Sequence, residues 1–338
     1  MSRDVTLEQI LAAAPAVYRV ARRTPLVPFR PLAPPAARHA DAPDPGDRLH
    51  LKLENLQPIG AFKIRGAANA VARLDEAARA SGVWTVSAGN AAQGVALAAR
   101  QAGLACSVLV IDAAPAAKID AIKRLGARII TTSYDEAWHV VEARIDDRLP
   151  GHFIHPFDDD DFICGNGTVG LELVAELPDV AAIVVSVGGG GLIAGVATAV
   201  KALRPGVRVY AAEPETAAPL TASRAAGRAT AAPTWRASFV DGCGGQSVTP
   251  SMWPLLRDLV DDTIVVSLDE IAAAMRASAA GAHVITEGAA GCAVAAALTG
   301  RAGPGPIAAI VSGGNVDPSV FAKILRGETP AMSGDITT

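Results

Sequence analysis

Cysteine is scarce in this sequence, and its few copies form no recognisable site. Four cysteines occur in 338 residues, with no CxxC pair and no ligand-like neighbours: Cys106, Cys164, Cys243 and Cys292. We therefore expect buried free thiols in a reducing compartment rather than a metal site or a disulfide framework. The signatures GxSxG, HExxH and the P-loop are also absent, so none of these three motifs indicates the chemistry.

An excess of positive charge is missing as well. Thirty Lys and Arg residues stand against 34 Asp and Glu residues, which gives a net charge of −4. With this composition we expect neither a basic surface that binds nucleic acid nor a polybasic membrane anchor. The first residues mix acidic and basic side chains without an apolar core, so we expect no signal peptide and a cytoplasmic protein.

One apolar stretch is long enough to suggest a membrane span. Residues 180–200 carry no charge, but five glycines lie among them, four of them consecutive. The β-branched run Ile183-Val184-Val185 is typical of a buried parallel strand. We expect a core strand, followed by a helix that begins near Leu192, and no membrane.

Strand-like and helix-like segments alternate along the chain. Apolar runs predict helices at 67–80, 93–102, 117–125 and 191–203, and strands at 49–53, 107–111, 128–132, 182–187, 207–211 and 307–311. This alternation is typical of an α/β fold with parallel strands covered on both faces. Residues 81–157 contain their own alternation, which predicts a small domain inserted into a large domain of 1–80 and 158–338.

Lys63 is the most informative residue of the sequence. It follows the turn-like Pro58-Ile59-Gly60 and the bulky Phe62. This setting suits an amine that is held rigidly to form a Schiff base. Taken alone, the segment is equally compatible with a surface lysine at the start of a helix.

Two glycine-rich segments favour the first interpretation. Residues Gly188, Gly189, Gly190 and Gly191, with the amide of Leu192, follow a strand and precede a helix. Glycines there let backbone N–H groups converge on a phosphate, although a flexible turn is the alternative. A second glycine-rich strand end begins at Ser312. A lysine, a phosphate loop and a polar strand end are what a protein needs to hold pyridoxal 5′-phosphate.

With these segments the chain resembles the serine/threonine dehydratase family of pyridoxal-phosphate enzymes, whose fold type II is shared with tryptophan synthase β subunits. The resemblance begins near Arg22 and covers nearly all of the chain. Besides the Lys63 and 188–191 segments it rests on Thr24-Pro25-Leu26, Ser87-Ala88-Gly89-Asn90-Ala91-Ala92-Gln93-Gly94, His155-Pro156-Phe157-Asp158, Gly165-Asn166-Gly167-Thr168 and Ser312-Gly313-Gly314-Asn315. It implies two open, twisted, mostly parallel sheets flanked by helices, with pyridoxal phosphate in the crevice between the domains.

The resemblance also implies roles for single residues. Lys63 forms the Schiff base and later takes the substrate's Cα proton, and Ser312 hydrogen-bonds the pyridine nitrogen. Phe62 packs against the cofactor ring, unless it is a plain core phenylalanine. Substrate carboxylate binding falls to Ser87, Ala88, Gly89 and Asn90, with Asn90 also at the cofactor's 3′-oxygen. A helix N-cap at Ser87 or Asn90 is compatible with this role.

Three alanines depart from the family's pattern. The family usually has Ser where this chain has Ala61 and His where it has Ala91, which points to a substrate other than the commonest one. Racemase-type members carry a second Ser at the position of Ala88, where it serves as the acid/base on the opposite face. An alanine methyl has no proton to transfer.

Several acidic and histidine positions are expected to play no catalytic part. Glu213 is a weak metal candidate, because some relatives bind a cation there with a later Asp that is Pro219 here; we expect no metal. The run Asp158–Asp161 is predicted to be a solvated acidic turn. His155, like the other histidines, lacks a nucleophile at a recognisable spacing and is interpreted as structural.

The predicted function is a lyase that deaminates a 3-hydroxy amino acid, L-threonine or L-serine, to a 2-oxo acid and ammonia by α,β-elimination. The chain ends soon after residue 325, so we expect no regulatory domain and a catabolic role. The alternatives are a serine racemase-like isomerase, a dehydratase for a bulkier 3-hydroxy amino acid, a β-replacement synthase and a non-catalytic binding protein. We expect a small-molecule substrate and a homodimer or homotetramer.

Overall fold

The computed structural model describes residues 3, 5–32, 48–112, 114 and 116–330. The chain divides into two compact units. Unit 1 consists of Met1–Arg23 and Gln57–Thr168, and unit 2 of Thr24–Leu56 and Val169–Thr338. Residues 57–80 are therefore grouped with the smaller sheet of the protein. The domain limits expected from the sequence, 81–157 within 1–80 and 158–338, stay a prediction.

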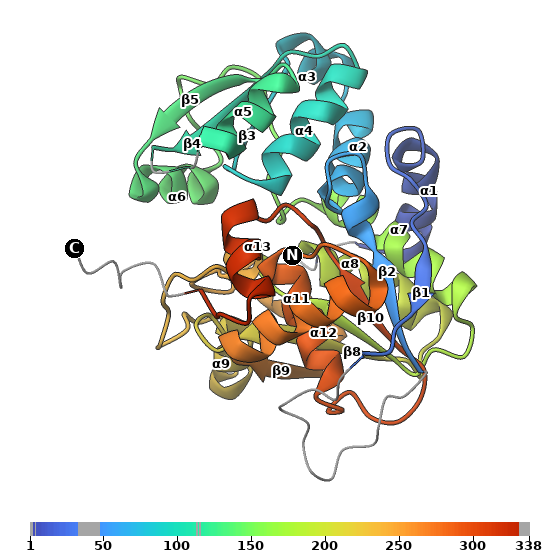
Figure 1. Cartoon of the computed structure of the whole chain (residues 1–338). Coiled ribbons are helices and arrows are strands. Elements are labelled where there is room, and N and C mark those ends of the chain that lie inside the picture. Colours follow the sequence, from blue (N-terminus) through green and yellow to red (C-terminus); the bar gives the residue numbers. More distant parts are fainter. Residues whose placement is uncertain (1–2, 4, 33–47, 113, 115, 331–338) are drawn as a thin grey trace, which may run out of the picture. The chain divides into compact units, whose positions relative to one another are not determined.

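Unit 1 is built on a four-stranded parallel sheet with the strand order β5-β4-β3-β6 (Figure 1). Its elements are α1 (Leu7–Val17), α2 (Lys63–Arg73), α3 (Glu76–Ser81), β3 (Val83–Val86), α4 (Asn90–Gln101), β4 (Cys106–Ile111), α5 (Ala116–Arg124), β5 (Arg128–Thr132), α6 (Tyr134–Ala143), β6 (His152–Phe153) and the first half of α7 (Asp160–Glu176). All four residues of β3 are buried, as expected for a strand covered on both faces.

Unit 2 contains a six-stranded sheet with the order β1-β2-β10-β7-β8-β9. Its elements are β1 (Leu26–Pro28), β2 (Leu49–Leu53), the 3₁₀ turn η2 (Glu54–Leu56), β7 (Ala182–Ser186), α8 (Gly191–Leu203), β8 (Arg208–Pro214), α9 (Pro219–Ala226), the 3₁₀ turn η3 (Asp241–Cys243), α10 (Trp253–Leu259), β9 (Asp262–Val266), α11 (Leu268–Ala282), α12 (Gly288–Leu298), β10 (Ile307–Val311) and α13 (Pro318–Leu325). Only the edge strand β1 runs antiparallel to its neighbour.

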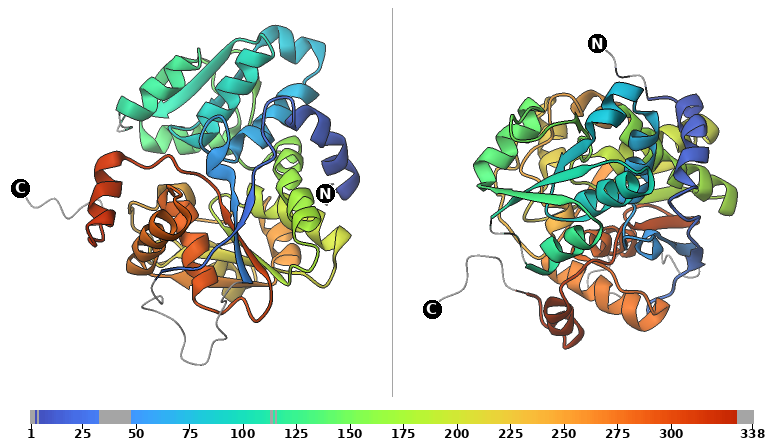
Figure 2. Two further views of the ribbon diagram at one scale, coloured as in Figure 1. Left: turned by 45° about the vertical axis from the view of Figure 1, so that its right-hand side comes forward. Right: turned by 90° about the horizontal axis from the view of Figure 1, so that it is seen from above.

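Helix α12 forms the centre of the unit 2 core. All of its residues from Gly288 to Leu298 are buried, and most of them are alanine or glycine. A helix that is apolar all round is buried on every side, and small side chains let it approach its neighbours closely. It packs against β10, β7 and β8 and lies beside α11, as Figures 1 and 2 show. Helix α11 begins at a capping box formed by Ser267 and Glu270.

The predicted fold class is confirmed: the protein has an α/β fold with two mostly parallel sheets and flanking helices. Each predicted strand is present within three residues at its ends. The helix predicted at 67–80 is wrong in one respect, because the chain forms two helices there. Helix α2 ends at Arg73, and Asp75 caps α3 by accepting a hydrogen bond from the amide of Ala78.

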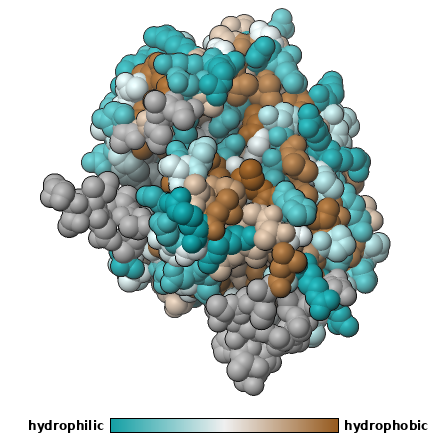
Figure 3. Space-filling model, viewed as in Figure 1, coloured by the Kyte–Doolittle hydropathy of each residue, from teal (hydrophilic) through white to brown (hydrophobic). Residues whose placement is uncertain are grey.

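The apolar stretch 180–200 lies in the core, as predicted. It forms β7, the glycine loop and α8, and most of its side chains are buried. Among the described residues, no helix has the length and apolar character that a membrane crossing requires. On the face shown in Figure 3, hydrophobic residues are interspersed with hydrophilic ones.

Unit 2 buries a lysine with two glutamates. The ammonium group of Lys52 lies 2.8 Å from a carboxylate oxygen of Glu172 and 2.7 Å from one of Glu176, and it donates to the carbonyl of Thr24. Lys52 and Glu172 are fully buried. A charge that is buried away from water must be paired, so each of these groups depends on the other.

We predict that Lys52→Ala lowers the free energy of unfolding by about 3–5 kcal/mol, because the buried Glu172 then loses the ammonium group of Lys52. Urea titration followed by circular dichroism measures the change. As a control, Arg257→Ala removes the exposed pair with Asp258 and should cost less than about 1 kcal/mol. If both variants lose the same free energy of unfolding, the buried ion pair contributes no more to stability than the exposed pair.

Candidate active site

Lys63 is the first residue of α2 and lies in unit 1. The turn before it is closed by a hydrogen bond from the Gly60 amide to the Gln57 carbonyl. Its side chain is half-buried rather than directed into solvent, so it is not the plain surface lysine that the segment alone allowed. The Nζ atom donates to the carbonyl of Pro156 at 2.5 Å. The rings of Phe62 and Phe162 have their centres 5.3 and 5.4 Å from Nζ, within the range of cation–π attraction.

Glycines allow the neighbouring helices to approach the start of α2. A Cβ atom on Gly165 of α7 would lie 2.4 Å from the carbonyl oxygen of Arg65. A Cβ atom on Gly94 of α4 would lie 3.0 Å from the carbonyl oxygen of Lys63. Both glycines belong to segments that carried the family resemblance. Their role in unit 1 is to let two helices hold the backbone of Lys63 in place.

The segment Ser87-Ala88-Gly89-Asn90 connects β3 to α4 in the same unit. The Gly89 amide donates to the Ser87 hydroxyl at 3.1 Å, and Asn90 is the first residue of α4. The helix N-cap is therefore Gly89, and the N-cap predicted at Ser87 or Asn90 is wrong. No side chain caps α4. The positive end of the helix dipole at this N-terminus suits the binding of a carboxylate.

The predicted phosphate loop lies in unit 2, between β7 and α8. Gly190 has a φ of 88°, a conformation that L side chains rarely adopt, and it caps α8 without a side-chain hydrogen bond. A Cβ atom on Gly188 would lie 2.9 Å from the carbonyl oxygen of Gly242. The loop is therefore a defined turn against η3 and not the flexible turn that was the alternative. Leu192 is buried in the first turn of α8.

Ser312 follows β10 directly and is 3% exposed. Strands β10 and β7 are parallel neighbours, with Ala309 opposite Val184. Their carboxyl ends therefore reach the same edge of the sheet, where ligands bind in open α/β folds. Unit 2 thus brings Ser312 and the glycine loop together, while unit 1 contains Lys63, Phe62 and the segment 87–90.

Each unit contains groups that fit a part of pyridoxal phosphate. The glycine loop has no room for a side chain at Gly188, and it leads into the N-terminus of α8, whose positive end suits a phosphate dianion. Ser312 has a buried hydroxyl that could bond the pyridine nitrogen. In unit 1, Lys63 has an amine that could bond the aldehyde. When bound, the cofactor withdraws electrons from the Cα atom of an amino acid and so makes its proton acidic.

Glu213 has a structural role that the sequence did not reveal. Its buried carboxylate accepts hydrogen bonds from the amides of Leu220 and Thr221 and from the Thr221 hydroxyl, at 2.6–2.8 Å. It therefore caps the N-terminus of α9, whose own N-cap Ala218 offers no side-chain acceptor. Burial raises the pKa of this carboxyl, and the bonds from Thr221 and Leu220 oppose that shift.

The prediction of a solvated acidic turn at Asp158–Asp161 is wrong for Asp158, whereas Asp160 and Asp161 have side chains that are 48% exposed in the first turn of α7. Asp158 is 4% exposed and forms ion pairs with Arg144 and Arg3. An isolated carboxylate would not be buried, but two guanidinium groups compensate its charge. Nothing in the spacing of the sequence pointed to Arg144, which lies 14 residues before it. The ring of Phe162 near Lys63 was missed for the same reason: only the fold brings α7 to the start of α2.

Comparison with known proteins decides the family. The family model described as "Pyridoxal-phosphate dependent enzyme" matches residues 17–313. The chain belongs to this family. It is therefore an enzyme that uses pyridoxal phosphate, and the predicted cofactor is confirmed.

Members of the family with curated names are similar over most of the chain. The L-threonine ammonia-lyase of Thermotoga maritima is 38% identical over 325 residues, which cover 95% of this chain and 78% of that protein. A serine racemase of Oryza sativa subsp. indica is 40% identical over 288 residues, 83% of this chain and 84% of that protein. The solved structure of maize serine racemase has a TM-score of 0.85 at 34% identity and covers 96% of this chain and 98% of that one. The resemblance to the dehydratase family is thereby confirmed.

We predict that Gly188→Ala weakens binding of pyridoxal phosphate about 10- to 100-fold, because the added Cβ displaces the loop from η3 and misdirects amides that donate to a charged group. Equilibrium dialysis of the apoprotein measures the affinity. The matched control is Gly206→Ala, since a Cβ there meets nothing within 4 Å. Unchanged affinity in Gly188→Ala would indicate that the phosphate binds in another part of the protein.

Proposed function

We propose that this enzyme is an ammonia-lyase that acts on a 3-hydroxy amino acid, L-threonine or L-serine, and releases a 2-oxo acid and ammonia. The similarity to the L-threonine ammonia-lyase of Thermotoga maritima over 95% of the chain supports the reaction class. The observation that carries the choice of elimination over racemisation is Ala88, the residue two positions after β3. A similar serine racemase from rice makes isomerisation the second candidate.

Lys63 performs the proton transfer in this proposal. Its amine takes the proton from the Cα atom of the bound amino acid. The β-hydroxyl would leave as water once a nearby acid has protonated it, and hydrolysis of the remaining enamine would release the 2-oxo acid and ammonia. The carbonyl of Pro156 accepts a hydrogen bond from Nζ, and the faces of two aromatic rings lie near it. Both kinds of neighbour are electron-rich and attract a protonated amine.

Substrate and cofactor are oriented by separate groups. The uncapped start of α4 at Gly89 and Asn90 would bind the substrate carboxylate, and Asn90 the cofactor's 3′-oxygen. Residues Gly188 to Leu192 would bind the phosphate, while Phe62 would pack on the ring. Ser312 would bond the pyridine nitrogen with a hydroxyl. A hydroxyl does not keep that nitrogen protonated, so electron withdrawal is weaker and rapid elimination is favoured over slower reactions.

Ala61 and Ala91 bear on which substrate side chain the site accepts, and an assay can test this specificity. Both are buried and carry methyl groups where the family usually has a hydroxyl and an imidazole. A panel of 3-hydroxy amino acids, assayed for release of 2-oxo acid, separates L-threonine and L-serine from bulkier substrates. We also propose a cytoplasmic, catabolic enzyme that forms a homodimer or homotetramer.

We predict that Lys63→Ala abolishes the visible absorption of the bound cofactor and lowers lyase turnover by about 10²- to 10⁴-fold, because the amine that bonds the aldehyde and moves the proton is lost. Absorption spectra and a keto-acid assay measure the two effects. Lys123→Ala, which removes an exposed lysine on α5, should keep both. A visible band that persists in Lys63→Ala would assign the bond to another lysine.

We predict that the unmodified enzyme converts L-serine to pyruvate, or L-threonine to 2-oxobutanoate, with little D-amino acid. Racemisation requires a proton on the face opposite Lys63, and the methyl group of Ala88 has none to give. Chiral chromatography of the serine reaction measures both products. Ala88→Ser should raise the yield of D-serine. If D-serine and pyruvate form at comparable rates in the unmodified enzyme, the isomerase is the better assignment.

A further inference from the structure

The Lys63 amine donates to a backbone carbonyl in the turn that connects β6 to α7. The chain bends at residues 156–158 of this turn. The Pro156 carbonyl in this turn lies 2.5 Å from Nζ of Lys63. A lysine side chain is a flexible four-carbon stem, so its amine is placed by the groups that accept its hydrogen bonds. The Pro156 carbonyl is such a group, and its position helps to determine where this amine lies when it is not bonded to the cofactor.

The side chain of His155 stabilises this turn through hydrogen bonds with its backbone. Its Nδ1 atom accepts hydrogen bonds from the amides of Asp158 at 2.9 Å and Phe157 at 3.3 Å. A nitrogen that accepts must be unprotonated, so the imidazole is neutral. Burial, above all, lowers the pKa of His155 to about 3, and the neighbouring Arg144, Lys63 and Arg3 charges act in the same direction against Asp158. The ring therefore keeps this acceptor across the neutral range.

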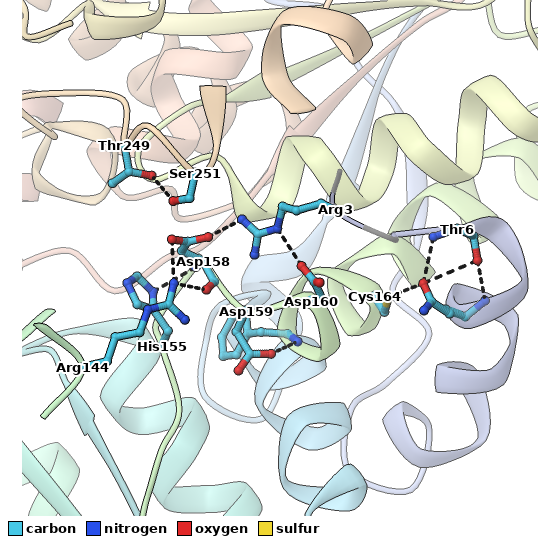
Figure 4. Close-up of polar contacts among 12 residues, drawn as sticks. Arg3, Thr6, Arg144, His155, Asp158, Asp159, Asp160, Cys164, Thr249 and Ser251 are labelled. Atoms are coloured by element: carbon cyan, nitrogen blue, oxygen red, sulfur yellow. Dashed lines mark hydrogen bonds and ion pairs between the residues drawn. The ribbon is translucent and has the colours of Figure 1, made fainter. Parts of the chain in front are cut away.

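An ion pair between Asp158 and Arg144 also stabilises the turn. One guanidinium nitrogen of Arg144 donates to the Asp158 carboxylate at 2.7 Å and to the Asp158 carbonyl at 2.9 Å. Arg3 pairs with the other carboxylate oxygen, and Figure 4 shows both arginines converging on Asp158. Arg144 itself has a φ of 59°, which is uncommon for a residue other than glycine. Such a conformation persists only where contacts maintain it.

We propose that Asp158, held by Arg144, is a positioning residue for Lys63: it fixes the turn so that the Pro156 carbonyl receives the amine whenever the substrate has taken its place on the cofactor. The carboxylate lies two residues from Pro156 and touches neither substrate nor cofactor in this proposal. The inference rests on the proposed role of Lys63 as the lysine that bonds the cofactor. It adds that the lysine returns to the aldehyde from a prepared position rather than from many rotamers.

The experiment compares two ligands of the apoprotein. Pyridoxal phosphate bonds the lysine with loss of water and gives a visible band, which stopped-flow absorbance records. Pyridoxamine phosphate has the same ring and phosphate but no aldehyde, so its binding reports the rest of the site. In Asp158→Asn we expect the band to form about tenfold more slowly at saturating pyridoxal phosphate, with unchanged affinity for pyridoxamine phosphate. The kcat of the loaded enzyme should fall more than its KM rises.

Asp161→Asn is the matched control. Asp161 belongs to the same acidic run, but its side chain is 48% exposed and pairs with Arg73 at 3.5 Å, away from the turn. This variant should form the band at the rate of the unmodified protein. If Asp158→Asn does not fold, Arg144→Gln carries the test, because it removes the same bonds from a side chain that is 47% exposed.

The rate of band formation and the affinity for pyridoxamine phosphate together decide whether Asp158 is a positioning residue. A band that forms at an unchanged rate in Asp158→Asn and Arg144→Gln would overturn the proposal, and so would an equal loss of affinity for both ligands, which indicates a general distortion. Either result leaves the lyase assignment intact as long as Lys63→Ala loses the band. Slower bond formation with unchanged pyridoxamine phosphate affinity, in a protein of any substrate preference, supports the positioning role.

Discussion

The parallel pairing of β10 with β2 on one side and β7 on the other is the constraint on which unit 2 depends. All five residues of β10 are buried, so the strand has no solvent face and its register is held by packing above and below. A slip of one residue would exchange the side chains of the two faces. Because the register is fixed, Ser312 and the glycine loop after β7 lie at the same sheet edge. The candidate cofactor groups of unit 2 are consequences of this pairing.

Unit 1 holds its functional group in a different way. Its sheet does not contribute Lys63, which begins a helix. The backbone of this residue is fixed by close helix packing at Gly94 and Gly165, and its amine by the carbonyl of Pro156. The ion pair of Asp158 and Arg144 stabilises the turn that contains this carbonyl. A neutral acceptor thus lies beside the lysine, and the charged groups of this ion pair hold the backbone behind that acceptor.

Much of the fold could be predicted because its signals are local. The β-branched runs at 182–187 and 307–311 and the apolar helices beside them have the periods of their structures, and tertiary packing did not override them. The break between α2 and α3 had a local signal too, since Asp75 is a typical N-cap residue, but a continuous alanine-rich pattern concealed it. The candidate site was predictable through its glycines, because a loop that must admit a phosphate excludes side chains.

The sequence by itself determined the α/β class and the cofactor, and it predicted the lysine and the phosphate loop that would hold that cofactor. It did so because each of these is encoded in a short contiguous pattern. Only the tertiary structure decided that Glu213 caps α9, that Asp158 is buried between two arginines, and that Pro156 receives the amine of Lys63. Those contacts join residues on different elements, many of them far apart in the chain. Burial and charge pairing arise from neighbours in space, so no pattern along the chain could have revealed them.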